Sequence, residues 1–378
     1  MKKIIFPWKI ITYCTVLLLF SKCKDPYDPP VLASNTKYLV VEGYINGNGL
    51  TSIKLSRTRN ITSGDTADRI NELNANVVIE DQNNITYPLT EEGNGIYTAN
   101  IFLDPANQYR LHIRTSANKE YKSDFVPYKQ SPPIDSIGWK FKNNDVQVYA
   151  NTHDAQNKTK YYRWSYSETW EYHAAFYSYL QYDESSNSLV SRTDQIYACW
   201  PSENSTNISL ASSAKLNMDV IHEAPLVLIP FHDKRISVLY SIFVTQYALD
   251  SIAYNYWQAI KSNTENVGSI FDPQPNQTKG NIHCVSDSSE TVIGYIGAGS
   301  TVDKRFFIDR SSMPNNWNLP SECTTISTHA DSLEYYFHVA GYIPIEEILP
   351  PGTYTGSTFT CVDCRASGGP NVKPSFWP

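Results

Sequence analysis

The 378-residue sequence lacks an excess of basic residues, with 31 Lys and Arg against 38 Asp and Glu and a formal charge of −7. Nucleic-acid binding depends on clustered Lys and Arg side chains that neutralise phosphates. We therefore predict that nucleic acid is not a partner. An acidic balance of this kind is instead typical of an exported protein that stays soluble and adheres little to anionic surfaces.

The sequence also lacks an apolar run long enough to span a bilayer. Its apolar N-terminal run, residues 10–20, has eleven residues, whereas a spanning helix needs roughly 20. Lys2 and Lys3 precede this run, so residues 1–22 have the form of a secretory signal peptide. Removal of that segment takes away four lysines and no acid, and moves the formal charge from −7 to −11.

The stretch LFSKCKDPYDPP after the apolar run resembles the lipobox of a bacterial lipoprotein. In that resemblance Cys23 becomes the new N-terminus and carries the acyl chains, palmitate among them. Lys24 and Asp25 resemble the signal that sends Bacteroidota lipoproteins to the outer face of the outer membrane. We predict a lipid-anchored protein facing the cell exterior, with a periplasm-facing lipoprotein or a free secreted protein as alternatives.

Cysteines are few, and an exported protein is expected to oxidise them to disulfides. Without Cys14 and Cys23 an odd number remains, so one thiol stays unpaired or bonds elsewhere. We expect Cys199 to pair with Cys284. We expect Cys323 to pair with Cys361 or with Cys364.

Common catalytic and metal-binding motifs are missing. The sequence has no HExxH and no GxSxG, so neither a zinc protease nor a hydrolase nucleophile elbow is indicated. The GYIGAGS run at residues 294–300 is followed by a strand pattern rather than a helix, which excludes a phosphate loop and favours a bend or bulge. The closing CVDCRASGG lacks a second metal-ligand pair and a βαβ setting, so a structural disulfide is predicted.

The histidines are spread singly, and two arrangements among them could form a metal or acid–base site. The pairs His222-Glu223 and His232-Asp233 lie ten residues apart and would meet if a hairpin joined them, and His329 lies close to Asp331. Scattered histidines are far more often surface residues than ligands. We therefore predict no metal and no cofactor.

What the sequence does contain is a long series of short strand patterns. Residues 23–35 are rich in Pro and Asp and read as a tether. Residues 36–130 hold seven strand patterns separated by Gly and Asn turns, which predicts an Ig-like or transthyretin-like β-sandwich. A Pro-rich connector follows, and residues 134–378 predict a larger β-rich domain with one packed α-helix that begins at Asp250 or Ser251. The fold class is therefore mainly β.

The stretch YYRWSYSETWEY, residues 161–172, gathers six aromatic rings with two glutamates. As a strand it places five rings and Glu168 on one face, and Arg163 with small polar residues on the other. Five rings on one face predict a core strand rather than a sugar-binding platform. Glu168 needs a cationic or hydrogen-bonding partner there, and the alternative is a general acid of a glycoside hydrolase.

A short glycosylation-like pattern, Asp65-Thr66-Ala67, occurs in the polar loop NITSGDTAD. It resembles the O-glycosylation acceptor of exported Bacteroidota proteins. Thr66 is the candidate acceptor.

Several motifs together resemble a Bacteroidota lipoprotein family, domain of unknown function 4249: LVVEGYI, IKLSRT, YYRWSYSETWEY, the segment from SIAYNYWQAIKSNTE to NIHC, VIGYIGAG and CVDCRASGG. The family has no assigned activity and supplies no catalytic residue. The resemblance implies a non-enzymatic accessory, for ligand binding or docking, of a TonB-dependent (SusC-like) transporter, so that a TonB-dependent outer-membrane receptor is the expected partner. The alternatives are a surface glycan hydrolase and an adhesion or envelope-structural protein.

Overall fold

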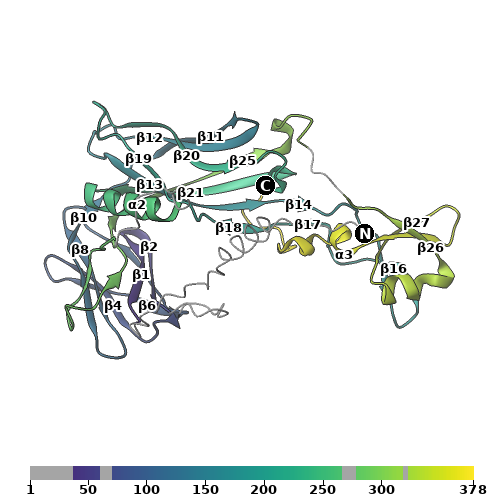
Figure 1. Cartoon of the computed structure of the whole chain (residues 1–378), viewed down its shortest axis with the longest axis horizontal. Coiled ribbons are helices and arrows are strands. Elements are labelled where there is room, and N and C mark those ends of the chain that lie inside the picture. The colour runs from purple at the N-terminus through teal and green to yellow at the C-terminus, as the bar shows by residue number, and fades with distance from the viewer. Residues whose placement is uncertain (1–36, 60–69, 266–277, 318–321) are drawn as a thin grey trace, which may run out of the picture.

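The computed structural model describes residues 37–59, 70–265, 278–317 and 322–378. The predicted signal peptide, the tether, the lipid site Cys23 with Lys24 and Asp25, and the glycosylation candidate Thr66 lie outside the described residues. The described part is mainly β, as the strand patterns predict (Figure 1). It contains two β-rich bodies and a projecting arm.

The N-terminal body is a β-sandwich with a continuous apolar core. This core forms because side chains alternate along the strands: in β2 (Asn48–Arg57) Ile53 and Leu55 are buried while Lys54 between them is exposed. In β8 (Gln108–Arg114) Tyr109, Leu111 and Ile113 are all buried, and they share the core with Ile53 and Leu55.

The sandwich has two layers joined along one edge. The first layer contains β1 (Leu39–Asn46), β2 (Asn48–Arg57), β3 (Ile70–Asn71), β6 (Thr90–Gly93), β7 (Ile96–Phe102) and β23 (Val292–Ile293). The second layer contains β4 (Asn76–Asp81), β5 (Thr86–Pro88), β8 (Gln108–Arg114), β9 (Glu120–Ser123), β10 (Val126–Lys129) and β22 (Ile282–Cys284). The short strand β24 (Ala298–Gly299) pairs in parallel with both β1 and β10 and joins the layers.

Residues 282–299 therefore belong to the N-terminal body, although the sequence division at residues 130–134 assigns them to the second domain. The predicted domain boundary is amended because residues 282–299 form three very short strands that pair with β1, β9 and β10 of the N-terminal body. Strands of two or three residues are too short to show an alternating pattern of their own.

The second body packs two antiparallel sheets around an aromatic core. One sheet is formed by β11 (Ile134–Lys142), β12 (Asp145–His153) and β20 (Val220–Ile229). The other is formed by β13 (Tyr161–Trp170), β18 (Ser202–Asn204), β19 (Ser209–Ser212), β21 (Leu239–Leu249) and β25 (Thr301–Asp309), with the one-turn helices η1 (Lys234–Ile236) and η2 (Arg310–Ser312) beside it.

Helix α2 (Ser251–Glu265) is the predicted packed helix. Its start is fixed by Asp250, whose carboxylate accepts a hydrogen bond from the Ala253 backbone N–H at 2.7 Å. Ala253 is buried against Tyr295 and Leu249, whereas the neighbouring Ile252 is 69% exposed. The helix lies where the two β-rich bodies meet (Figure 1).

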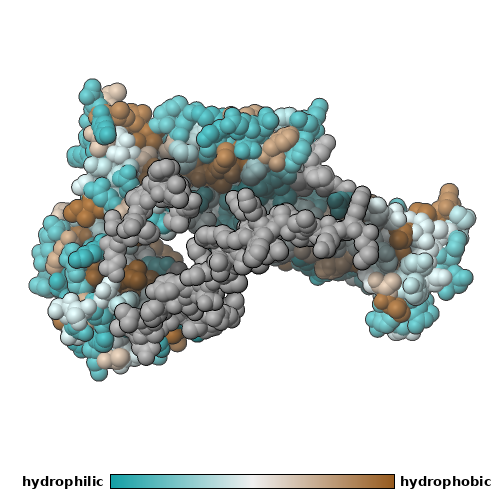
Figure 2. Space-filling view, viewed as in Figure 1, coloured by the Kyte–Doolittle hydropathy of each residue, from teal (hydrophilic) through white to brown (hydrophobic). Residues whose placement is uncertain are grey.

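The arm projects from the second body and carries both disulfides. Its elements are β14 (Tyr172–His173), β15 (Leu180–Asp183), β16 (Ser188–Ser191), β17 (Ala198–Cys199), β26 (Ile326–His329), η3 (Ala330–Ser332), the π-helical turn η4 (Glu334–Val339), β27 (Ile343–Ile348), β28 (Thr353–Ser357), α3 (Phe359–Val362) and η5 (Cys364–Ser367). Figure 2 shows hydrophobic residues at its outer end, and Val339 and Leu349 of the arm are 67% and 85% exposed.

None of the helices in the described ranges combines the length and apolar character needed to cross a membrane.

Candidate functional site

A cleft of about 1140 Å³ lies between the two β-rich bodies. The N-terminal sandwich lines it with β1 and β2, and the second body lines it with β13, β21, β25 and helix α2. Ligand sites occur preferentially at such domain junctions, in concave spaces of several hundred Å³. The cleft is therefore the candidate site.

The glycine-rich run at residues 294–300 contributes Gly294 and Tyr295 to the lining of the cleft. Gly294 has φ +139°, and a Cβ there would lie 2.2 Å from the carbonyl oxygen of Val41 in β1. A Cβ at Gly299 would lie 1.9 Å from the carbonyl oxygen of Lys129. Glycine is needed at both positions so that the chain can lie against β1 and β10. The run continues into β25 rather than a helix, as the strand pattern that follows it in the sequence predicts.

The opposite wall is built from β13, β21 and α2. Arg163 of β13 lies directly opposite Tyr247 of β21 in the antiparallel register. Its guanidinium carbon is 4.4 Å from the centre of the Tyr247 ring and 4.2 Å from the centre of the Trp257 ring of α2. Both distances are within the range of cation–π attraction. Two aromatic faces therefore fix the position of this cation beside the cleft.

Aromatic rings dominate the junction around Arg163. The Tyr44 ring of β1 meets the Tyr247 ring edge to face at 5.0 Å, so one aromatic contact crosses from the sandwich to the second body. The rings of Tyr256 and Tyr295 stack at 5.0 Å. These contacts place aromatic surface at the junction, beside charged lining residues that include Glu42, Arg57 and Asp303.

A small recess adjoins the cleft. Its volume is about 10 Å³, and the two spaces share Gly43, Tyr44, Arg163, Trp257 and Tyr295 as lining residues. A recess of this size accommodates about one water-sized group. The Tyr44 hydroxyl is buried and has no hydrogen-bond partner among the described residues.

The aromatic face of β13 is core, as predicted. Tyr162, Trp164, Tyr166 and Trp170 are buried in the cluster between the two sheets of the second body. The opposite face is the one that meets the cleft, through Arg163. The stretch thus contributes to the site through its polar face and to the core through its rings.

Glu168 is 6% exposed and is satisfied by two neighbours. Arg235 donates a hydrogen bond to its carboxylate at 2.8 Å, and the Tyr240 hydroxyl donates another at 2.7 Å. Burial opposes the charge on Arg235, but hydrogen bonds to Asp233 and the charge of Glu168 raise the Arg235 pKa above its ordinary value. Glu168 does not line the cleft, so its surroundings give no support to the glycoside-hydrolase alternative.

The predicted histidine pairs do not converge. Glu223 forms an ion pair with Lys140, and Asp233 forms one with Arg235. His232 instead contacts the backbone oxygen of Asn316 at 2.8 Å. His329 lies beside the Thr353 hydroxyl at 3.4 Å, and its predicted companion Asp331 contacts Ser332. Across the described ranges, no group of three or more His, Cys, Asp or Glu side chains could hold a metal ion.

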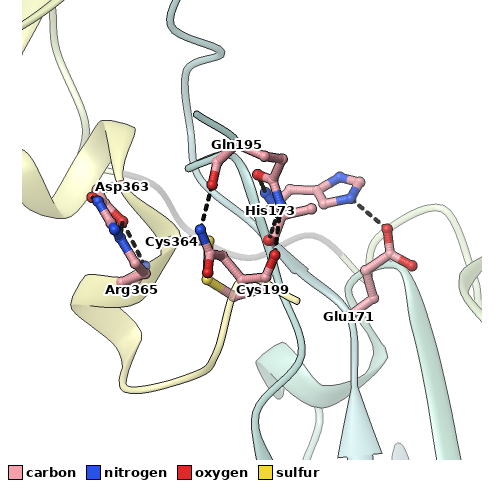
Figure 3. Close-up of a disulfide and its surroundings, with 9 residues drawn as sticks. Glu171, His173, Gln195, Cys199, Asp363, Cys364 and Arg365 are labelled. Carbon is pink, nitrogen blue, oxygen red and sulfur yellow. Dashed lines mark hydrogen bonds and ion pairs between the residues drawn. A yellow bond between two sulfur atoms is a disulfide. The ribbon is translucent and has the colours of Figure 1, made fainter. Parts of the chain in front are cut away.

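Both disulfides join segments of the arm. Cys199 bonds to Cys364, which corrects the expected pairing of Cys199 with Cys284 (Figure 3). Cys323 bonds to Cys361, one of its two predicted partners. Cys284 is a buried free thiol in β22, a strand that pairs with β9 of the N-terminal sandwich, whereas Cys199 is in β17 of the arm.

Arg163 is the site residue that sequence reasoning did not single out. On its own strand it belongs to a polar face with three small hydroxyl residues, which looks like an ordinary solvent-facing side. Its partners Tyr247 and Trp257 come from β21 and α2, so only long-range pairing brings them together. A lone arginine among small polar residues on a strand was the available signal.

The fold and the cleft define a mainly β protein of two joined bodies with an aromatic junction site and a disulfide-stapled arm. The chain belongs to the family described as Domain of unknown function (DUF4249), which it matches over residues 24–305. Every residue that lines the cleft, from Val40 to Asp303, falls within that range, whereas residues 322–378 of the arm and C-terminus lie beyond it. A comparison with curated proteins finds no match.

Proposed function

We propose that this protein is a non-enzymatic lipoprotein that captures a small ligand in the cleft between its two bodies. The observation that carries the proposal is the cleft itself, which combines about 1140 Å³ of space with aromatic walls and one stacked cation. Sites of this type bind ligands by apolar contact and orient them by a few polar groups.

A ligand screen tests the proposal. The mature chain with Cys23 replaced by Ser is screened against sugars, amino acids, peptides and nucleosides, and binding is followed by tryptophan fluorescence and calorimetry. Trp257→Ala removes a cleft ring and should weaken a cleft ligand at least tenfold, because a buried aromatic contact of this size contributes about 1–3 kcal/mol. Trp139→Ala, a matched change in β11 away from the cleft, should leave binding unchanged.

The same screen can contradict the proposal. If no compound binds, or if the compounds that bind are indifferent to Trp257→Ala, the cleft is not a capture site.

We propose further that Cys23 carries the lipid anchor and that Lys24 and Asp25 direct the protein to the cell exterior. The N-terminal sequence supports this placement. Labelling of cells with palmitate should mark the wild-type chain and not Cys23→Ala, and protease added to intact cells should degrade the anchored chain. Labelling of Cys23→Ala, or full protection from protease, would count against the anchor or its outward orientation.

The partner is proposed to be a TonB-dependent outer-membrane receptor. Exposed apolar residues on the arm, Tyr335, Val339 and Leu349, support contact with another protein, because isolated folded chains rarely gather such residues without a partner. The chain should co-purify with a large outer-membrane receptor in mild detergent. A native pull-down that yields no such receptor would argue against the accessory role.

A further inference from the structure

We propose that the ligand of the cleft is an organic carboxylate whose acidic group pairs with Arg163 and Tyr44 while a ring-shaped body lies against the aromatic wall. This inference rests on the proposed capture of a ligand in the cleft and names its chemical class. It follows from two groups at the junction: the Arg163 guanidinium, which has no ion-pair partner among the described residues, and the Tyr44 hydroxyl, which has no hydrogen-bond partner among them.

The first donor is Arg163, which forms no ion pair with any described residue. Glu42 and Asp303 also line the cleft. The contacts of Arg163 are instead the faces of Tyr247 and Trp257. A ring that lies over the guanidinium face leaves the in-plane N–H groups available, and that planar fork matches the two oxygens of a carboxylate.

Burial makes this arrangement unfavourable for the free protein. Loss of water around Arg163 lowers the pKa of its guanidinium, and the neighbouring Tyr247 offsets only part of the effect. Arginine nevertheless stays charged at neutral pH. The Arg163 side chain is half-buried, and a charge that loses water without gaining a counter-charge is costly, so an anion that enters the cleft gains affinity by supplying one.

The second donor is the Tyr44 hydroxyl, which is buried and lacks a hydrogen-bond partner among the described residues. Burial, together with the nearby Tyr247, raises the pKa of Tyr44 well above its ordinary value, so the hydroxyl keeps its proton. Tyr44 and Arg163 line the same recess of about 10 Å³. That recess has room for about one oxygen-sized group, which both donors can reach.

The residues that line the cleft indicate the chemistry of the rest of the ligand. Tyr256, Trp257 and Tyr295 line the cleft next to Arg163 and present ring surface rather than charge. A ring-shaped body, either an aromatic ring or the apolar face of a sugar, fits such a wall by stacking. The two donors and the aromatic residues together indicate a ligand with a carboxylate attached to a ring.

Arg305 provides the structural comparison. It too lies against two rings, Phe243 and Phe376, without an ion pair to a described acid. It differs because its guanidinium donates to the Ser241 hydroxyl at 2.8 Å and because it lines neither the cleft nor the recess. Arg305 therefore serves as a matched control for a stacked arginine that holds no ligand.

The test uses two pairs of probes that differ in the acidic group: indole-3-acetate with indole-3-acetamide, and methyl β-D-glucuronide with methyl β-D-glucoside. Binding to the mature chain is measured by calorimetry. In at least one pair the acid should bind about tenfold or more tightly than its neutral partner, because a hydrogen bond to a charged group is stronger than one between neutral groups. Arg163→Gln should abolish that preference, Arg163→Lys should keep part of it, and Arg305→Gln should keep all of it.

Thermal unfolding of each variant shows whether it is folded, and Arg163→Lys retains the charge if Arg163→Gln is not folded. Equal binding of acid and neutral probes overturns the inference but leaves ligand capture standing. An acid preference that survives Arg163→Gln, or the absence of binding by both acids at millimolar concentration, also overturns it.

Discussion

Glu168 shows how a single carboxylate is accommodated on an aromatic face. It accepts hydrogen bonds from Arg235 and Tyr240, and Arg235 is held in turn by Asp233. Burial, with the adjacent Glu168 charge as a further cause, raises the pKa of Tyr240, so this hydroxyl remains a donor. The group is an ion-pair network inside the second body, and its geometry accounts for the glutamate without a reaction.

Glu168→Gln should destabilise the fold. The amide keeps the shape but removes the charge that faces Arg235, and hydrogen bonds to charged groups contribute about 1.5–3 kcal/mol. Urea unfolding should therefore show a loss of that order in the free energy of unfolding. Glu203→Gln, a change at an exposed residue paired with Glu168 across the strands, should alter it by about 0.5 kcal/mol or less. A Glu168→Gln variant as stable as the wild type would show that the network is not structural.

For single residues, the sequence predicts which side chains are buried better than it predicts which residues they contact. Period-two alternation in β13 correctly placed four rings and Glu168 in the core, because that signal is local. The partners of Glu168 and Arg163 come from η1, β21 and α2. No local pattern determines which strand lies beside which, so these contacts required the structure.

At the scale of elements, Glu290 links residues 282–299 to the rest of the N-terminal sandwich. It lies between β22 and β23, and its carboxylate accepts hydrogen bonds from Tyr121 of β9 at 2.7 Å and from Lys119. Arg57 of β2 approaches it at 3.4 Å. Burial alone would raise the Glu290 pKa, but the hydrogen bonds from Lys119 and Tyr121 outweigh burial and hold it below its ordinary value of 4.5.

The lowered pKa predicts a pH-dependent contribution to stability. A carboxylate with a depressed folded-state pKa stabilises the fold above its unfolded pKa and loses that contribution as the pH falls through the folded value. The difference in unfolding free energy between wild type and Glu290→Gln should thus be fully present at pH 7 and shrink below about pH 4.5. Denaturant unfolding at a series of pH values measures it, with the exposed Glu346→Gln as control. A difference that stays constant down to pH 3 would contradict this role.

The two disulfides predict how many free thiols the mature chain contains. Mature chain with Cys23 replaced by Ser should contain one free thiol, Cys284, which is 5% exposed and should resist alkylation in the native state. Alkylation in urea without reductant, followed by mass spectrometry, should add one label, and peptide mapping should place it on Cys284. Labels on Cys199 or Cys364 instead would contradict the observed pairing.

Cysteine pairing also marks a limit of sequence reasoning. The CVDC segment was correctly assigned to structural disulfides, yet its two cysteines serve different bonds, one to Cys323 and one to Cys199. The expected partner of Cys199, Cys284, lies in a strand that returns to the other body. Spacing along the chain carries no information about such a return.

For the molecule as a whole, the returning strands make the junction possible. Residues 282–299 add β22, β23 and β24 to the sandwich and then continue as β25 in the second body, so the chain passes between the two bodies at residues 129–134 and again at residues 299–301. The two crossings lie side by side, because the Ser131 backbone N–H donates a hydrogen bond to the Ser300 hydroxyl at 2.9 Å. The family match covers β22, β23 and β24 and ends at residue 305, within β25. A cleft formed by two bodies and crossed by the Tyr44–Tyr247 contact is consistent with capture of a ligand at their junction.

The central claim is that a ligand occupies this junction and is held through Arg163. Native mass spectrometry of the chain isolated from the membranes of cells that make it tests the claim most directly. Wild type and Arg305→Gln should each carry a small-molecule adduct of the same mass, and Arg163→Gln should lack it. The claim is contradicted if none of these three proteins carries an adduct, or if the adduct is equally abundant on Arg163→Gln and on the wild type.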